Sequence, residues 1–239
     1  MKAVAIASGG MDSTTLLYQL HDLGCDTLVV SFDYGQRHKK ELTFVAGTCQ
    51  RLGFQHRIVD LTNITDLIAS SSLTGEQEVP DGHYTDLTMR ATVVPNRNAI
   101  MLSIAAGAAM NIGAKFVATA VHGGDHFIYP DCRPPFINAI SDAMTTAAGE
   151  LFVDGGFQGV WAPYVTEDKA YIATLGHSMN VPWDLTWSCY KGGDVHCGRC
   201  GTCVERREAF QLADVADPTE YEDYDFAWQA IAEHQEKNQ

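Results

Sequence analysis

The feature that most constrains this chain is a short apolar run that turns through two glycines into a helix. Residues 3–7 read Ala-Val-Ala-Ile-Ala, which is typical of a buried central strand. Ser-Gly-Gly breaks the run at residues 8–10, and Leu16, Leu17 and Leu20 then follow at helical spacing. A helix that begins at such a turn directs free N–H groups and its positive dipole end at one point, which suits phosphate. An ordinary strand–turn–helix remains the alternative.

The glycine pattern distinguishes between classes of phosphate loop. No lysine follows the glycines and the G-x-G-x-x-G spacing is missing, so neither the Walker-A loop nor the dinucleotide fingerprint fits. The pattern Ser-Gly-Gly-x-Asp-Ser resembles the PP-loop of the ATP pyrophosphatases, which cleave ATP to AMP and pyrophosphate. Because a carboxylate beside pyrophosphate needs a cation between them, Asp12 is expected to act through Mg²⁺. The residues expected to bind ATP or pyrophosphate here are Ser8, Gly9, Gly10, Met11, Asp12, Ser13 and Thr14.

Composition predicts a soluble cytoplasmic protein. The 239 residues are 46% hydrophobic and 19% charged, as in globular proteins, and the net charge of −14 argues against direct nucleic-acid binding. Met1 and Lys2 lead straight into the first strand, so no signal peptide is expected, and the apolar stretch 99–110 is too short to span a membrane. Seven cysteines, an odd number, indicate a reducing compartment.

Strand-like and helix-like segments alternate along the chain. This alternation predicts an α/β fold with a Rossmann-like, doubly wound parallel sheet, whose ligands bind at the carboxyl ends of the strands. We expect residues 1–182 to form this domain, and residues 183–239 to form a small zinc-binding region with an acidic helical tail. The expected strands are residues 3–7, 27–32, 57–59, 116–121 and 160–163, and helices are expected from 98, capped by Asn98, and from 166, capped by Thr166.

Polar residues follow several of these strands at the expected ligand edge. Arg37 and His38 come after the second strand, where they either face nucleotide phosphates or cap a helix start. His122 and Asp125 come after the fourth strand, and two intervening glycines favour a site there. The long stretch 60–90 shows little periodicity and is interpreted as a lid.

Two further charged features predict ligand contacts. Asp131 and Arg133 lie in a proline-rich turn, where an aspartate can accept paired N–H donors of a purine-like ring and an arginine can bind a carboxylate; a surface salt bridge is the alternative. Lys169 lies in the first turn of a predicted helix, an unfavourable end for a cation, which indicates a phosphate or carboxylate partner.

Four cysteines form the pattern Cys-x₇-Cys-x₂-Cys-x₂-Cys, at Cys189, Cys197, Cys200 and Cys203. Four thiolates complete a tetrahedral Zn²⁺ shell with no open position, so the site is expected to be structural, with one zinc per chain. An iron–sulfur cluster is the alternative. The acidic run that follows is interpreted as a solvated tail; it comprises Asp214, Asp217, Glu220, Glu222, Asp223 and Asp225.

Taken together, these motifs resemble the 7-cyano-7-deazaguanine synthase family over nearly the whole chain. Tyr-Pro-Asp-Cys-Arg at 129–133, with the four cysteines, is the specific part of the match. The resemblance implies a ligase that acts on 7-carboxy-7-deazaguanine, ammonia and ATP-Mg²⁺, often as a homodimer. It implies catalytic roles for Asp12, Ser13, Lys169 and Arg97, ATP contacts for Arg37 and His38, and deazaguanine contacts for His122, Asp125, Asp131 and Arg133.

The sequence departs from that family pattern at three places. Asn96 stands where a glycine is usual and tolerates the same positive φ. Residues 123–128 differ from the usual segment, and Pro135 replaces an acidic residue. These differences leave open an enzyme that ends at the amide, or one that joins the activated acid to another amine in a DNA-modification or antiviral pathway. Another ATP pyrophosphatase and a non-enzymatic zinc module are further alternatives.

Overall fold

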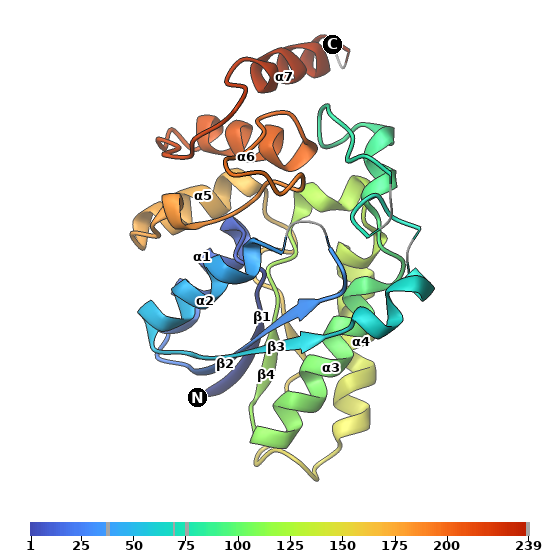
Figure 1. Ribbon diagram of the computed structural model, residues 1–239. Coiled ribbons are helices and arrows are strands. Elements are labelled where there is room, and N and C mark those ends of the chain that lie inside the picture. The colour runs from blue at the N-terminus through green and yellow to red at the C-terminus, as the bar shows by residue number, and fades with distance from the viewer. Residues whose placement is uncertain (37–38, 69, 75–76, 238–239) are drawn as a thin grey trace.

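The computed structural model describes residues 1–36, 39–68, 70–74 and 77–237, and it is built on a five-stranded parallel sheet (Figure 1). The strand order is β3-β2-β1-β4-β5, with the first strand of the chain in the centre. This order is that of a doubly wound sheet and confirms the Rossmann-like fold. The strands are β1 (Lys2–Ile6), β2 (Asp26–Asp33), β3 (Gln55–Asp60), β4 (Phe116–Ala118) and β5 (Val160–Trp161).

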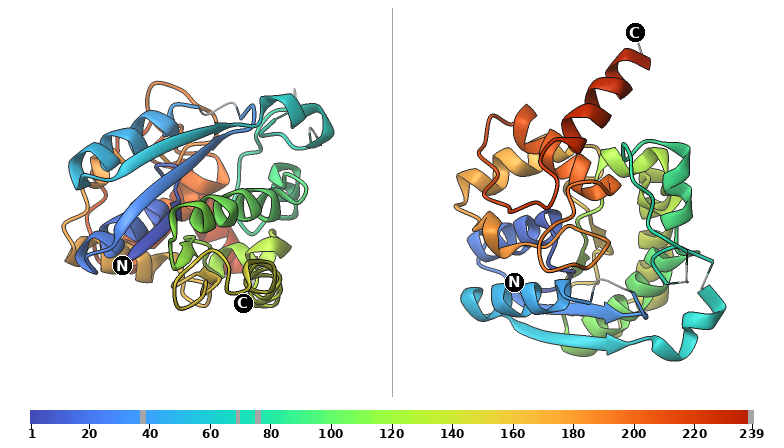
Figure 2. Two further views of the ribbon diagram at one scale, coloured as in Figure 1. Left: turned by 90° about the horizontal axis from the view of Figure 1, so that it is seen from below. Right: turned by 45° about the horizontal axis from the view of Figure 1, so that its top comes forward.

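Helices cover both faces of the sheet because the central strand is apolar on both sides. Ala3 and Ala5 pack with α1 (Met11–Asp22), α2 (Glu41–Leu52) and α5 (Lys169–Ser178). Val4 points the other way, toward α3 (Arg97–Ile112) and α4 (Pro134–Ala148), which the two views of Figure 2 place on the opposite face. In the described part of the chain, no helix is both long and apolar enough to cross a membrane.

Two helices begin at residues other than the predicted ones. Asp168, and not Thr166, caps α5, since its side chain accepts a hydrogen bond from the Tyr171 N–H at 2.7 Å. Asn98 is the second residue of α3 and not its cap; the residue before this helix is Asn96, with φ +55°. Asparagine reaches this left-handed region more easily than most residues, so it can replace the expected glycine.

The lid over residues 60–90 stays a prediction, and part of the stretch that the structure describes is packed into the core. Two short 3₁₀ helices, Thr62–Ile68 and Leu87–Thr92, form within and just beyond this stretch. Ser72 and Leu73 between them are fully buried. A segment with such side chains inside the core is part of the fold, because opening it would expose apolar surface to water.

The C-terminal region packs directly on the sheet domain. It contains the 3₁₀ helix Trp183–Leu185, α6 (Gly201–Leu212) and α7 (Phe226–Lys237). Trp183 and Phe210 share one apolar cluster with Met11 of α1 and Ala173 of α5. The division at residue 182 therefore stays a prediction.

The acidic run is not a solvated tail throughout. Asp217 accepts a hydrogen bond from Arg206 Nε at 3.3 Å and one from the Tyr221 hydroxyl at 2.6 Å. Arg206 is fully buried, so its charge has to be balanced by a nearby anion. Asp223 accepts hydrogen bonds from the N–H groups of Asp225 and Phe226, where α7 begins. These contacts correct the sequence interpretation for both residues.

Candidate active site

The glycine loop between β1 and α1 is held in shape by one hydroxyl. Ser13 Oγ accepts hydrogen bonds from the N–H groups of Ser8 and Gly9, both at 3.2 Å, and donates one to the Gly10 carbonyl at 3.3 Å. Gly9 has φ +98°, and a Cβ there would lie 2.4 Å from the Glu41 carbonyl oxygen. Only glycine fits this position, because α2 approaches so closely. Gly10, the residue before α1, has no side chain with which to cap the helix, so the first N–H groups remain available for an anion.

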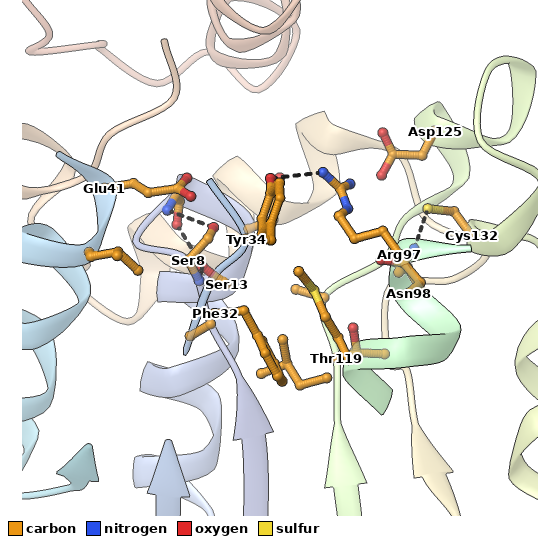
Figure 3. A pocket seen from close by; sticks show the side chains of 18 of the residues that line it. Ser8, Ser13, Phe32, Tyr34, Glu41, Arg97, Asn98, Thr119, Asp125 and Cys132 are labelled. Carbon is orange, nitrogen blue, oxygen red and sulfur yellow. Dashed lines mark hydrogen bonds between the residues drawn. The ribbon is translucent and has the colours of Figure 1, made fainter. Parts of the chain in front are cut away.

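Beside this loop lies a cavity of about 220 Å³ at the carboxyl ends of the strands (Figure 3). One wall carries Ser8, Ser13 and Glu41, and the other carries Asn98 and Thr119. This is the edge at which ligands bind in doubly wound sheets. The predicted ligand edge is therefore hollow.

Buried charge spans the top of this cavity. Arg97 Nη1 donates a hydrogen bond to the Tyr34 hydroxyl at 3.2 Å, which joins the two walls (Figure 3). Burial raises the pKa of Glu41 to about 8, although a hydrogen bond from Gln36 and the charge of Arg97 act in the opposite direction. Arg97 thus brings a positive charge to the cavity, as the sequence interpretation expected.

Of the other residues expected to bind ATP, two have buried side chains and two lie outside the described residues. Met11 is 1% exposed and its side chain packs among apolar residues, so only its backbone can face a phosphate. Thr14 is equally buried, and among the described residues its hydroxyl has no hydrogen-bond partner. The expected ATP contacts Arg37 and His38 lie outside the described residues.

Five ionisable side chains from four segments meet at one end of the loop, and we call them the charge cluster: Asp12, His122, Asp125, Lys169 and Glu205. Lys169 Nζ lies 3.3 Å from Asp12 Oδ2 and donates a hydrogen bond to Glu205 Oε2. His122 Nε2 lies 3.5 Å from Asp125 Oδ2 and 3.8 Å from Asp12 Oδ2. The unfavourable position of Lys169 at a helix start is thus offset by two carboxylates.

Burial and charge oppose each other within the charge cluster. Burial by itself would lower the pKa of Lys169, but the carboxylates of Asp12 and Glu205 outweigh it and raise the pKa well above the ordinary value. Burial raises the pKa of Glu205, against the lowering effect of Lys169. The cluster holds three carboxylates and one ammonium group, and Asp12 Oδ1 is buried with no hydrogen-bond partner in the described chain. An additional cation beside Asp12 would satisfy that oxygen.

The proline-rich turn does not bring its charged residues into the cavity. Asp131 Oδ2 accepts a hydrogen bond from the Asn98 N–H at 3.2 Å and so satisfies a donor in the first turn of α3. Arg133 is exposed, and neither residue lines the cavity, whereas Cys132 between them does. A direct deazaguanine contact for Asp131 and Arg133 therefore has no support from this geometry.

Several residues around the cavity carried no predicted role. Glu205 lies on α6, and nothing in its local sequence indicates a functional role. The only indirect indication was that Lys169, placed at a helix start, was expected to pair with an anion. Tyr34 follows β2 at the expected ligand edge, but nothing in the sequence indicated its hydrogen bond to Arg97. Tyr190 follows the first cysteine of the cysteine motif and lines the same cavity.

The four cysteines form a closed, buried group, which we call the cysteine cluster: Cys189, Cys197, Cys200 and Cys203. Their Sγ atoms all lie within 4.8 Å of one another, with 3.5 Å between Cys200 and Cys203 and 3.9 Å between Cys197 and Cys203. A tetrahedral zinc with Zn–S bonds of about 2.3 Å separates its sulfurs by about 3.8 Å.

Backbone N–H groups surround these sulfurs. Cys197 N–H donates to Cys189 Sγ at 3.4 Å, and the N–H groups of Arg199 and Cys200 donate to Cys197 Sγ at 3.4 and 3.3 Å. Hydrogen bonds from the other three cysteines hold the pKa of Cys189 well below its usual range. The donor set fits a metal ion that binds thiolates.

A doubly wound sheet with this glycine loop at its ligand edge defines an enzyme of the PP-loop class that uses ATP. The sequence profile of the family described as "Queuosine biosynthesis protein QueC" matches residues 2–214. The chain belongs to this family.

Curated relatives match over nearly the full length. A protein of Agrobacterium fabrum named 7-cyano-7-deazaguanine synthase is 56% identical over 236 residues, covering 98% of this chain and 97% of its own. A protein of Paracoccus denitrificans with the same name is 53% identical over 236 residues, covering 98% and 99%. Among solved structures, NMN synthetase from Francisella tularensis is similar at a TM-score of 0.49 and 12% identity, covering 99% of this chain and 84% of that chain.

Proposed function

We propose that this protein is a ligase that converts 7-carboxy-7-deazaguanine and ammonia to 7-cyano-7-deazaguanine with ATP. The observation that carries the proposal is the identity of 53–56% to proteins of that name, over nearly the whole chain. A cavity bounded by the glycine loop and by Arg97 supports it, because an anionic acid and a triphosphate both need cations and N–H donors.

The chemistry needs two activations by ATP. A carboxylate oxygen is a poor leaving group, so it attacks the α-phosphorus of ATP, forming an acyl-adenylate and releasing pyrophosphate. Ammonia displaces AMP from the acyl carbon and loses a proton, which gives the amide. The amide oxygen attacks a second ATP, which releases pyrophosphate, and the amide nitrogen loses one proton; loss of AMP and of the second nitrogen proton then yields the nitrile. Each of the two oxygens of the original carboxylate leaves on AMP.

The residues around the cavity supply binding groups for these steps. Ser8, Gly9 and Gly10 offer N–H and hydroxyl donors to the pyrophosphate, and Ser13 exchanges its bonds to the loop for bonds to phosphate. Lys169 and Arg97 offset negative charge that develops on the transferring phosphoryl group. Arg37 and His38 are retained as further phosphate contacts from the sequence pattern.

Metal ions complete the proposal in two separate roles. The unsatisfied Asp12 Oδ1 suits Mg²⁺, which is a hard cation, prefers oxygen ligands and accompanies ATP. The cysteine cluster suits one Zn²⁺ per chain, since its four sulfurs leave no position for a substrate. This zinc stabilises the fold around α6 and takes no part in the chemistry.

Recognition of the deazaguanine is assigned to the part of the cavity opposite the loop. Asp125 lines this cavity and can accept ring N–H donors, with His122 holding its carboxylate at 3.5 Å. Asp131 and Arg133, expected from the sequence to touch the ring, are proposed to act indirectly, by fixing the start of α3.

The remaining expectations concern product, location and assembly. The names of the relatives favour the nitrile, so an enzyme that ends at the amide or conjugates another amine is not favoured. All seven cysteines are free, which supports a reducing, cytoplasmic location. A homodimer is proposed from family resemblance, and sedimentation velocity would test it.

A single assay tests the function. The purified protein is incubated with ATP, 7-carboxy-7-deazaguanine and ¹⁵N-ammonium, and the products are identified by mass. We expect two AMP per nitrile and one ¹⁵N in the product. Accumulation of the amide without nitrile, or no consumption of the acid, would contradict the proposal.

A further inference from the structure

A second, much smaller cavity adjoins the active-site cavity. Its volume is about 30 Å³, which is room for one molecule the size of water or ammonia. Asp125 and Tyr190 line both cavities, so the smaller one lies one side chain away from the larger. Neither a nucleotide nor a deazaguanine fits in such a volume.

The lining of the small cavity is both acidic and aromatic. The carboxylates of Asp125 and Glu205 face it, together with the tyrosines Tyr84, Tyr129 and Tyr190. Carboxylates accept hydrogen bonds from an ammonium ion, and the faces of aromatic rings attract it. The same lining repels carboxylate and phosphate groups.

A glycine in the lining keeps this space open to a ligand. Gly124 lines the cavity, and a Cβ at Gly124 would lie 3.0 Å from Glu205 Oε1 and 3.1 Å from His122 Nδ1. The absence of a side chain at Gly124 therefore keeps this part of the cavity wall open beside the Glu205 carboxylate.

We propose that this small cavity is the binding site for ammonium, the second substrate, next to the cavity that holds the activated acid. This inference rests on the proposed function for the identity of the substrate. Ammonia is mostly ammonium at neutral pH, and it has the size and the donors that the cavity requires. Asp125, on the shared wall, positions the ammonium ion and accepts the proton that it must lose, and the ammonia so formed attacks the acyl carbon with its lone pair.

Val79 offers a way to change the volume without touching the charge cluster. It is buried, lines the small cavity and contributes no polar atom of its side chain. Val79→Leu fills the cavity, and we expect the KM for ammonium to rise about tenfold, while the KM values for ATP and the acid change less than twofold. Val215→Leu is the matched control, because Val215 lines a different cavity, next to Arg207.

Val79→Ala enlarges the cavity and tests the size limit. We expect the parent enzyme to reject methylamine and Val79→Ala to form the N-methylamide, which mass spectrometry detects and which cannot lose water to become a nitrile. An unchanged KM for ammonium in Val79→Leu, with no use of methylamine by Val79→Ala, would overturn the inference while leaving the proposed function intact.

A binding experiment separates this inference from the proposed function. Thallium(I) resembles ammonium in charge and size, and crystals soaked in thallium(I) acetate reveal it by anomalous scattering. We expect a thallium site in the small cavity of the parent protein and none in Val79→Leu. A cavity that holds only water in both would overturn the inference, whether or not the enzyme makes the nitrile.

Discussion

The cysteine cluster is a buried group of ionisable side chains and the charge cluster a partly buried one, and they differ in how completely their atoms are satisfied. In the cysteine cluster the sulfurs contact one another and also accept backbone N–H groups. In the charge cluster Asp12 Oδ1 and His122 Nδ1 have no partner within the described residues, and the carboxylates outnumber the one lysine. One metal ion can bind all four sulfurs of the cysteine cluster. The charge cluster still has unsatisfied polar atoms that can bind a substrate or its cation.

The two clusters differ equally in their construction. The cysteine cluster comes from one short stretch, residues 189–203, that turns back on itself and ends in the first turn of α6. The charge cluster joins α1, the segment after β4, the start of α5 and α6. The cysteine cluster is therefore local and closed, while the charge cluster is assembled from distant segments and stays open.

Loss of a cysteine ligand is expected to have the largest effect. Cys200→Ser should lower the free energy of unfolding by about 5 kcal/mol or more and abolish the bound zinc, because zinc binding in such sites contributes directly to folding. Elemental analysis and thermal unfolding measure both. Cys25→Ser is the control, since Cys25 is also buried but lies outside the cysteine cluster. Iron in place of zinc, or full stability without metal, would contradict the structural zinc.

Removal of the lysine from the charge cluster is expected to have the second-largest effect. Lys169→Met leaves Glu205 buried beside other carboxylates, so stability should fall by about 3–5 kcal/mol. The double variant Lys169→Met/Glu205→Gln should regain most of this loss but no activity. Chemical denaturation of both variants measures the difference.

The loss in Lys169→Met should depend on pH. Burial raises the pKa of Glu205 above its unfolded value, and removal of Lys169 raises it further. A carboxyl whose folded pKa is raised stabilises the fold while protonated, and that stability is lost as the pH rises through the folded pKa. The variant should therefore be closer to the parent at about pH 5 than at about pH 8. An equal loss of stability in Lys169→Met at both pH values would contradict the pairing of Lys169 with Glu205.

Asp12→Asn tests whether the charge cluster acts on ATP. The amide keeps the size of the side chain but removes the charge proposed to bind Mg²⁺, so AMP release should slow about a thousandfold, with little change in stability. Asp22→Asn, at the exposed far end of the same helix, is the control and should behave like the parent. AMP release by Asp12→Asn at near the parent rate would show that the cluster does not act on ATP.

The smallest effect is expected at Asp131. Asp131→Ala removes the acceptor for the Asn98 N–H and should cost about 1 kcal/mol of stability, with Asp131→Asn close to the parent. Calorimetric titration with 7-carboxy-7-deazaguanine checks the indirect role. A loss of affinity of about tenfold or more in both variants would restore the direct contact that the sequence pattern favoured.

Features that depend on neighbouring residues could be predicted from the amino-acid sequence alone. The glycine loop, the parallel sheet and the four cysteines are local patterns, because hydrophobic periodicity and short metal-ligand spacings act within a few residues of one another. The interaction of Lys169 with an anion was also predicted from local sequence, because a cation is unfavourable at the start of a helix.

Contacts between side chains that are distant in the sequence depend on the folded structure and could not be predicted. Glu205 joined Lys169, and Asp131 bonded the start of α3 instead of entering the cavity. Asp217, interpreted from its neighbours as solvated, became the partner of the buried Arg206. The physical reason is common to all three cases. A buried charge or an unsatisfied N–H group must find a partner wherever the fold brings one, and the packing of helices on the sheet decides which one it meets.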